Sequence, residues 1–265
     1  MLENKWLIPI KAPKKTERLL FTFHYAAASA SIFYPWRNIL DENTKVYAVE
    51  LPGRGTRYEE EPISDIKTIT MKIAEAIRPH LGSAPVTFFG HSMGGLLAYE
   101  TAILLSLDCE KPIDHFIASA VNPPGYRQIR TQTQIDDEIF KKELIKYGGI
   151  PDSLLTNIDF WDIYLPTARV DFAMVMNYTP SEKPVPLNCN ITAIVGKRDD
   201  IVKVEKAKHW KKLTKSSFNL IEIDGGHLFI KETKRIVEIV NSILLKDYRK
   251  LPLSTLIHEE GTYVV

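Results

Sequence analysis

A strand-turn-helix segment with a serine at its apex constrains the fold of this chain most strongly. The apolar, β-prone run Pro85–Phe89 leads through Gly90-His91-Ser92-Met93-Gly94-Gly95 into a helix-forming stretch. A serine at such a sharp bend needs a strained backbone, and glycines two positions before and after it let the strand and the helix approach closely. The pattern G-x-S-x-G therefore predicts a nucleophilic hydroxyl of Ser92 raised above the end of a sheet.

The same five-residue pattern also occurs in turns that bind nothing, so the prediction depends on partners elsewhere in the chain. Nucleophilic catalysis by serine needs a general base, an acid that orients this base, and N–H groups that stabilise an oxyanion. One such donor is the amide of Met93, because it lies at the positive N-terminal end of the predicted helix.

Apolar runs that are typical of buried strands alternate along the chain with helical periodicities. The runs are Arg18–Phe23, Lys45–Leu51, Pro85–Phe89, His115–Val121, Asn190–Val195 and Phe218–Ile223. Apolar residues at helical spacing fall between them, as in Ile66–Ile77 and Ile236–Ile243. This alternation predicts the α/β class, with a mostly parallel central sheet flanked by helices.

The alternation stops in residues 123–186, which predict a helical lid inserted within a single domain of residues 1–265. Asp136–Tyr147 has a helical pattern that Gly148 and Gly149 end. A later run from Phe160 is rich in aromatic and methionine side chains, which form either ordinary core or a ligand channel. The C-terminal tail, residues 247–265, is expected to be disordered.

Composition limits the function classes. The chain has 265 residues, 45% hydrophobic content and a formal net charge of +1, so nucleic acid and anionic membranes are not expected partners. Cys109 and Cys189 have no metal-ligand spacing, and we expect no disulfide, metal or cofactor. No secretory signal or membrane-spanning run is found, and we expect a monomer in the cytoplasm.

The general base is predicted to be His227. Catalytic groups of parallel sheets collect at the carboxyl ends of strands, and Phe218–Ile223 is followed by Asp224-Gly225-Gly226-His227. The order serine, acid, histidine along the chain is the one found where the nucleophile lies on a strand-turn-helix bend of this kind. We expect His80, His115 and His209 to be solvent-exposed instead.

Two adjacent carboxylates, Asp199 and Asp200, follow the strand Asn190–Val195 and could each orient the imidazole. Only one of them can do so, because neighbouring side chains of an extended loop point to opposite sides. We predict Asp199 as the triad acid and Asp200 as a solvated loop residue.

The second oxyanion donor is expected in the small-residue loop that follows the strand Arg18–Phe23. We assign it to the backbone amide of Ala26, with that of Ala27 as the alternative; a simple turn is the non-functional interpretation. Tyr25, Ala27 and His91 are the expected substrate contacts.

Several of these segments together resemble one family, the type II thioesterases of polyketide and nonribosomal peptide synthesis. The matching segments are Phe23–Ala30, Leu51–Arg57, Gly90–Gly95 with Leu97–Glu100, Leu165–Pro166 with Arg169 and Asp171–Phe172, Gly196–Val202, and Gly225–His227 with Phe229. The resemblance spans about residues 18 to 245, and L-P-G-R-G-x-R is its most specific element. It implies an α/β-hydrolase fold, and it supports Asp199, since the family's triad aspartate stands three residues after the glycine.

The resemblance implies a stand-alone enzyme that hydrolyses acyl groups from the phosphopantetheine arm of acyl or peptidyl carrier proteins. Two departures from the family pattern are present. The family usually has proline in place of His24 and glycines in place of Ala27 and Ala28, so a loop that needs positive φ would be strained here.

The alternatives are a medium-chain fatty acyl carrier thioesterase, a small-molecule carboxylesterase, and a non-catalytic binding module of the same fold. Arg54 either shapes the loop beside the site or lies in a solvated turn, and Arg57 is expected to be solvated. The lysine-rich stretch Lys203–Lys215 is either a surface for an acidic carrier domain or an ordinary charged helix face.

Overall fold

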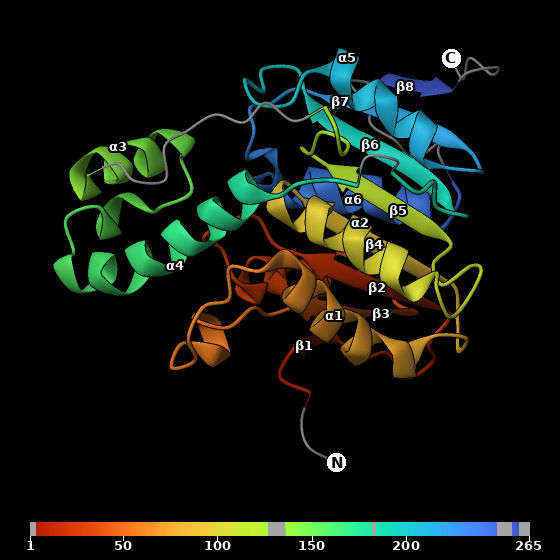
Figure 1. Cartoon of the computed structure of the whole chain (residues 1–265). Coiled ribbons are helices and arrows are strands. Elements are labelled where there is room, and N and C mark those ends of the chain that lie inside the picture. The colour runs from red at the N-terminus through yellow and green to blue at the C-terminus, as the bar shows by residue number, and fades with distance from the viewer. Residues whose placement is uncertain (1–3, 127–135, 182–183, 248–255, 260–265) are drawn as a thin grey trace.

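An eight-stranded sheet forms the centre of the molecule, with strand order β1-β3-β2-β4-β5-β6-β7-β8 (Figure 1). The computed structural model describes residues 4–126, 136–181, 184–247 and 256–259. The strands are β1 (Leu7–Lys11), β2 (Arg18–Phe23), β3 (Thr44–Val49), β4 (Val86–His91), β5 (His115–Ser119), β6 (Asn190–Gly196), β7 (Phe218–Ile223) and β8 (Leu256–Glu259). Neighbours from β3 to β7 pair in parallel, so their carboxyl ends share one edge.

Both outer strands pair antiparallel and were not predicted from the sequence. β1 contains Pro9, and its register with β3 shifts between Pro9 and Lys11. Proline is tolerated there because an edge strand has no partner on its outer side. β8 lies in the tail that was expected to be disordered; the remainder of that tail after residue 247 falls outside the described residues.

Helices cover both faces of the sheet (Figure 1). They are α1 (Ile66–Ile77), α2 (Met93–Leu105), α3 (Asp137–Tyr147), α4 (Ile158–Asn177), α5 (Val204–Ala207) and α6 (Thr233–Leu244). α1 and α2 pack on one face in a large apolar cluster. On the other face, α6 packs in a second cluster that includes Phe33 and Trp36 of a 3₁₀ segment, Ala30–Asn38. Each face of the sheet therefore has its own apolar layer, as expected of strands buried on both sides.

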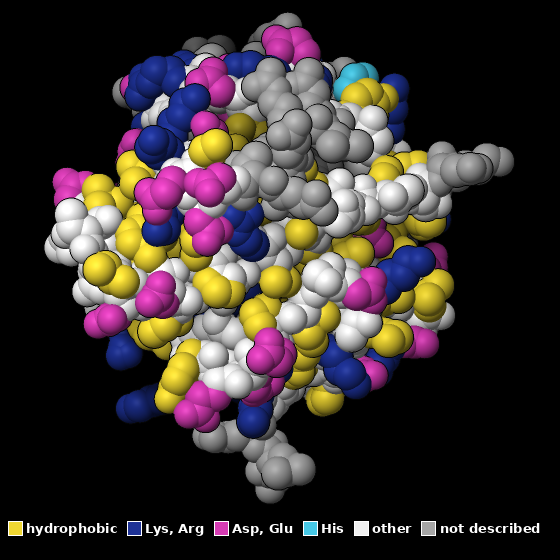
Figure 2. Space-filling view, turned by 60° about the vertical axis from the view of Figure 1, so that its left-hand side comes forward, with side chains coloured by type: hydrophobic (Ala, Val, Ile, Leu, Met, Phe, Trp, Pro, Cys, Tyr) yellow, Lys and Arg dark blue, Asp and Glu magenta, His cyan; other side chains and the backbone are white. Residues whose placement is uncertain are grey.

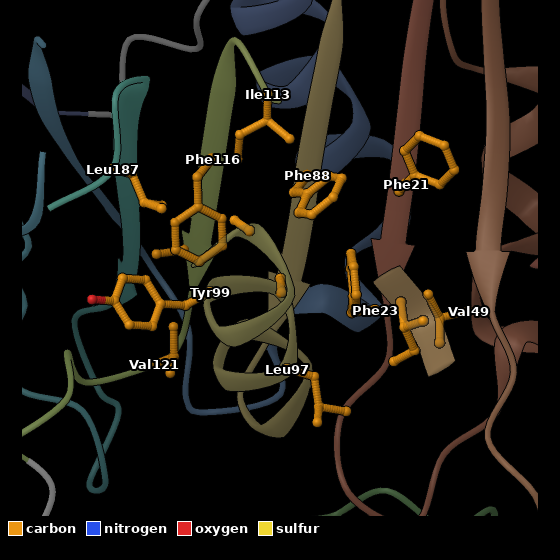
Figure 3. Close-up of a cluster of buried hydrophobic side chains, with 14 of the residues drawn as sticks. Phe21, Phe23, Val49, Phe88, Leu97, Tyr99, Ile113, Phe116, Val121 and Leu187 are labelled. Atoms are coloured by element: carbon orange, nitrogen blue, oxygen red, sulfur yellow. The ribbon is translucent and has the colours of Figure 1, made fainter. Parts of the chain in front are cut away.

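The helix that follows Ser92 is fixed by this core. Leu97 and Tyr99 of α2 lie against Phe23, Phe88 and Phe116 of three neighbouring strands (Figure 3). These five side chains are at most 2% exposed. Because α2 is buried almost all round, its N-terminus has a set position relative to the ends of β2 and β4.

α3 and α4 lie outside the sheet and form a helical cap, defined here as residues 136–177 (Figure 1). The cap has a small apolar cluster of its own, which includes Phe140, Trp161 and Leu165. Trp161 and Leu165, which belong to the aromatic run from Phe160, are therefore ordinary core residues of the cap. Among the described residues, no helix is long and apolar enough to cross a membrane.

Candidate active site

Ser92 sits on the predicted sharp bend between β4 and α2, with φ of 54° and ψ of −116°. Close approach explains the flanking glycines. A methyl group on Gly94 would lie 2.2 Å from the Phe23 carbonyl oxygen, and one on Gly90 would lie 2.4 Å from that of Gly94. No larger residue fits at either position without moving the backbone, so the strained conformation of Ser92 is built into the packing of β2, β4 and α2.

The imidazole of His227 joins Ser92 to Asp199. Its Nε2 lies 2.9 Å from Ser92 Oγ, and its Nδ1 lies 2.9 Å from Asp199 Oδ2. The loop that carries His227 follows β7, and the next residues, Phe229 and Ile230, are buried and anchor it. Three side chains from the carboxyl ends of β4, β6 and β7 thus form one hydrogen-bonded chain, which has the geometry of a nucleophile, a base and an orienting acid.

Asp199 and Asp200 differ sharply in their surroundings. Asp199 is 1% exposed, and its Oδ1 accepts hydrogen bonds from the amides of Ile201 (2.8 Å) and Val202 (3.0 Å). Burial by itself raises the pKa of Asp199, but the contacts with His227 and the two amides outweigh burial and lower this pKa below its ordinary value. The side chain of Asp200 is 97% exposed and points to Lys203. Only Asp199 is placed to act on the imidazole.

His91 corrects an expectation, since its ring is fully buried and does not face the site as a substrate contact. Its Nε2 lies 2.9 Å from the carbonyl oxygen of His227, and its Nδ1 lies 2.9 Å from the hydroxyl of Ser119. A carbonyl only accepts, so Nε2 carries the proton and Nδ1 accepts from Ser119. Burial, followed by the nearby His227, lowers the pKa of His91 to about 3, which keeps the ring neutral. Its position indicates that it holds the backbone of His227.

The loop after β2 contains both candidates for the second oxyanion donor, the amides of Ala26 and Ala27. Ala27 has φ of 63°, the positive value that its methyl group disfavours. Its N–H donates to Asp171 Oδ2 at 2.7 Å, which removes it as an oxyanion donor. Neither the Ala26 amide nor the Met93 amide donates to any other group in the described part of the chain. Both N–H groups are therefore free to donate, and Met93 directly follows Ser92.

His24 and Tyr25 belong to the same loop. His24 is 2% exposed, and its Nδ1 donates to the Tyr25 carbonyl at 2.8 Å, so this histidine bonds within the loop where the family usually has proline. Burial, and then the charge of Arg54, lower the pKa of His24 to about 4. The Tyr25 side chain is partly buried, and its ring centroid lies 5.9 Å from that of His91.

Both arginines of the L-P-G-R-G-x-R segment are buried, so the expectation of a solvated Arg57 is wrong. Arg57 is 6% exposed; its Nη1 donates to the Glu50 carbonyl, and its Nη2 pairs with Glu60 at 2.7 Å. Arg54 is 8% exposed and pairs with Asp171 of α4, with Nη2 2.8 Å from Oδ1. Sequence reasoning missed Asp171 as a partner, although both residues lay in segments that carried the family resemblance.

Comparisons with known proteins point to one family. The family model described as Thioesterase domain matches residues 18–244. A protein of Brevibacillus parabrevis named linear gramicidin dehydrogenase LgrE is 34% identical over 91% of this chain and 93% of its own length. The gramicidin S biosynthesis protein GrsT of Aneurinibacillus migulanus is 32% identical over 87% of this chain and 90% of its own. The solved structure of RedJ, a thioesterase from the prodiginine biosynthetic pathway in Streptomyces coelicolor, has a TM-score of 0.80 and 28% identity, and the match covers 88% of this chain and 87% of that one.

Proposed function

The chain belongs to the thioesterase family, and from that premise we propose that it is a stand-alone hydrolase that removes acyl groups from the phosphopantetheine arm of carrier proteins. The observation that carries the proposal is the chain of contacts from Ser92 through His227 to Asp199, each 2.9 Å long. GrsT and RedJ, by their names, belong to gramicidin S biosynthesis and to the prodiginine biosynthetic pathway. The Brevibacillus relative carries a dehydrogenase name, whereas the family model and the serine site both favour hydrolysis.

The proposed reaction has two halves. In the first, Ser92 Oγ attacks the thioester carbonyl carbon while His227 Nε2 takes the hydroxyl proton. The oxyanion accepts hydrogen bonds from the amides of Met93 and Ala26, each of which contributes on the order of 3 kcal/mol to the barrier reduction. Collapse of the tetrahedral intermediate breaks the C–S bond, and the thiol leaves with the proton from His227.

In the second half, a water molecule gives its proton to His227 and attacks the acyl-enzyme ester. Collapse then returns the proton to Ser92 Oγ and releases a carboxylic acid. Throughout both halves, Asp199 fixes the imidazole tautomer and stabilises the imidazolium. The ionised form that this role needs is the one that its lowered pKa favours.

A substrate panel tests the function. We expect kcat/KM to be much higher for acyl groups on a carrier protein than for acyl-CoA or nitrophenyl esters, and we expect Ser92→Ala to abolish all of these activities. A preference for free esters would instead support a carboxylesterase, and a preference for medium-chain fatty acyl carriers would support the fatty acyl alternative. Failure of the parent protein to react with a fluorophosphonate probe would support a non-catalytic binding module.

The partner proposal concerns the stretch Lys203–Lys215, called here the basic segment. It begins at the loop of Asp199, where Lys203 Nζ donates to the Asp199 carbonyl at 2.8 Å, and it ends just before β7, at the other edge of the sheet. Lys208, Lys211, Lys212 and Lys215 are all exposed, in a chain whose formal net charge is only +1. This concentration of exposed positive charge favours a partner with an acidic surface. We therefore place the acidic face of a carrier protein against the basic segment.

The double variant Lys208→Glu/Lys215→Glu tests this contact. We expect kcat/KM for the carrier-bound thioester to fall about tenfold at low salt because electrostatic steering is lost. Hydrolysis of a free acyl-pantetheine thioester should stay unchanged. Lys67→Glu/Lys72→Glu, which reverses two exposed charges on α1, is the matched control. Equal loss in the two double variants would contradict the assignment of the basic segment.

A further inference from the structure

A buried ion pair links the cap to the loop that carries the proposed oxyanion donor. Asp171 of α4 is 1% exposed, and both of its carboxylate oxygens are engaged by the guanidinium of Arg54. Asp171 Oδ2 also accepts the N–H of Ala27 at 2.7 Å. Arg54 Nη1 in turn donates to the Ala28 carbonyl at 3.3 Å. The carboxylate and the guanidinium therefore bind the loop on both sides of the Ala27–Ala28 peptide, at the Ala27 N–H and at the Ala28 carbonyl.

A second contact joins the same helix to the same segment. Thr167 lies four residues before Asp171 and hence on the same face of α4. Its hydroxyl donates to the Gly53 carbonyl at 2.9 Å, one residue before Arg54. This face of α4 is thus fixed to the L-P-G-R-G segment at two successive turns. The contacts at both turns are hydrogen bonds between buried groups, which are strongly directional.

The Ala27 contact bears on the chemistry because of where Ala27 stands. Its φ of 63° is unfavourable for a residue with a side chain, so it persists only where the surroundings hold it. Because the Ala27 N–H donates to the carboxylate of Asp171, it is not free to donate to another group. The preceding amide, that of Ala26, has no protein partner among the described residues and lies at the start of this strained turn.

We propose that Asp171, held by Arg54, is a positioning residue that keeps the Ala27 peptide turned away from Ser92 and so leaves the Ala26 amide aimed at the oxyanion. It touches neither the substrate nor the reacting atoms. This role rests on the proposed serine hydrolysis, and it deepens that proposal by making the cap helix α4 part of the catalytic geometry. A cap that moved away would release Ala27 and with it the second oxyanion donor.

Two double variants separate this role from simple structural support. Arg54→Met/Asp171→Asn and Arg54→Met/Asp171→Leu both remove the buried charge pair, and neither leaves a lone buried charge, which would be strongly destabilising. The Asn variant keeps an oxygen that can accept the Ala27 N–H, whereas the Leu variant does not. The two therefore differ in the one hydrogen bond on which the proposal depends.

We expect kcat of the Leu variant to be about 100-fold below that of the Asn variant, the size of effect seen when one oxyanion donor is lost. KM should agree within about threefold, because the interaction acts on the transition state and not on the bound substrate. Affinity for an alkyl boronic acid, which forms a tetrahedral adduct with serine, should fall in parallel with kcat. Equal kcat values in two folded variants would overturn the proposal.

The assay uses a nitrophenyl acyl ester beside the carrier-bound thioester. The ester reports the chemistry of Ser92 whatever the natural substrate is, so a wrong substrate assignment leaves this comparison intact. Should the Leu variant not fold, Arg54→Met/Asp171→Ala takes its place, since it also lacks an acceptor for the Ala27 N–H and leaves no lone charge. We then expect the Ala variant to have a lower kcat than Arg54→Met/Asp171→Asn at unchanged KM; equal kcat values overturn the proposal.

Discussion

The carboxyl ends of the parallel strands and the loops that follow them, called here the sheet edge, carry Ser92. This sheet edge and the helical cap are held in place in different ways. The sheet edge is surrounded by two large apolar clusters in which most side chains are fully buried. The cap has one small cluster of its own, reaches the larger one through Met174, and exposes several isoleucines, among them Ile139, Ile158 and Ile163. On the face that Figure 2 shows, with the left-hand side of Figure 1 turned forward, hydrophobic side chains lie interspersed with charges of both signs.

The molecule therefore combines a rigidly packed site with a cap that is held less tightly. The nucleophile and its base are placed by packing, which tolerates little displacement. The cap is joined to the segment below it by directional polar contacts, those of Thr167 and Asp171. Substitutions in the sheet edge should therefore damage both folding and chemistry, while substitutions in the cap other than those at Asp171 should act mainly on local order.

The largest effect is expected within the sheet edge itself, at Asp199. Asp199→Asn should lower kcat by about 10⁴-fold, because the amide stabilises the wrong imidazole tautomer and cannot balance the imidazolium. Asp200→Asn should change kcat less than twofold, since its side chain is 97% exposed. Steady-state kinetics of the two variants, measured side by side, make the comparison. A larger loss in Asp200→Asn would reverse the assignment of the triad acid.

The next effect compares a glycine of the sheet edge with one of the cap. In Gly94→Ala, the new methyl group would meet the Phe23 carbonyl oxygen at 2.2 Å, so we expect a loss of several kcal/mol in unfolding free energy together with activity. Gly148 follows α3 with φ of 75°, and a methyl group added to it would have no atom within 4 Å. In Gly148→Ala only the unfavourable backbone conformation therefore costs free energy, about 1 kcal/mol. Denaturant unfolding measures both variants. Similar losses would show that the cap is as tightly packed as the sheet edge.

The last effect concerns pH and is absent at neutral pH. His115 of β5 is 7% exposed, contrary to the sequence expectation, and burial lowers its pKa from 6.5 to about 4. This side chain binds a proton at higher pH in the unfolded chain than in the native state, so it should contribute up to about 3 kcal/mol to the fall in unfolding free energy as pH drops from about 6.5 to 4. His115→Asn should reduce this slope.

Residues 136–177 of the cap contain no histidine. Hydrogen exchange of cap amides reports the free energy of local opening of the cap. This free energy should accordingly change little over this pH range. An unchanged slope of the unfolding free energy in His115→Asn would contradict the assignment of its pKa. A cap whose local opening tracks pH as strongly as global unfolding would show that the two regions open together.

The sequence predicted the sheet edge better than the cap, for physical reasons. Six strands and the contacts of Ser92 with His227 follow patterns that are local, since each strand is a continuous apolar run and each loop follows its own strand. The pairing of Arg54 with Asp171 joins residues 117 positions apart, and no local period marks it.

The outer strands and two buried histidines were missed for related reasons. β1 was missed because it contains Pro9, and proline argues against a strand unless that strand is known to lie at the side of the sheet. The burial of His91 and His115 depends on polar partners in other strands, Ser119 and Thr192, which satisfy the rings inside the core. Such pairings become visible only once the strand order is known.

The most direct test of the account is the mass of the intact protein after rapid mixing with an acyl-carrier thioester. The account predicts a transient acyl adduct that peptide mapping places on Ser92, and its absence in Ser92→Ala. An adduct on another residue, or one that persists in Ser92→Ala, would contradict the claim that the hydroxyl on the bend between β4 and α2 is the nucleophile.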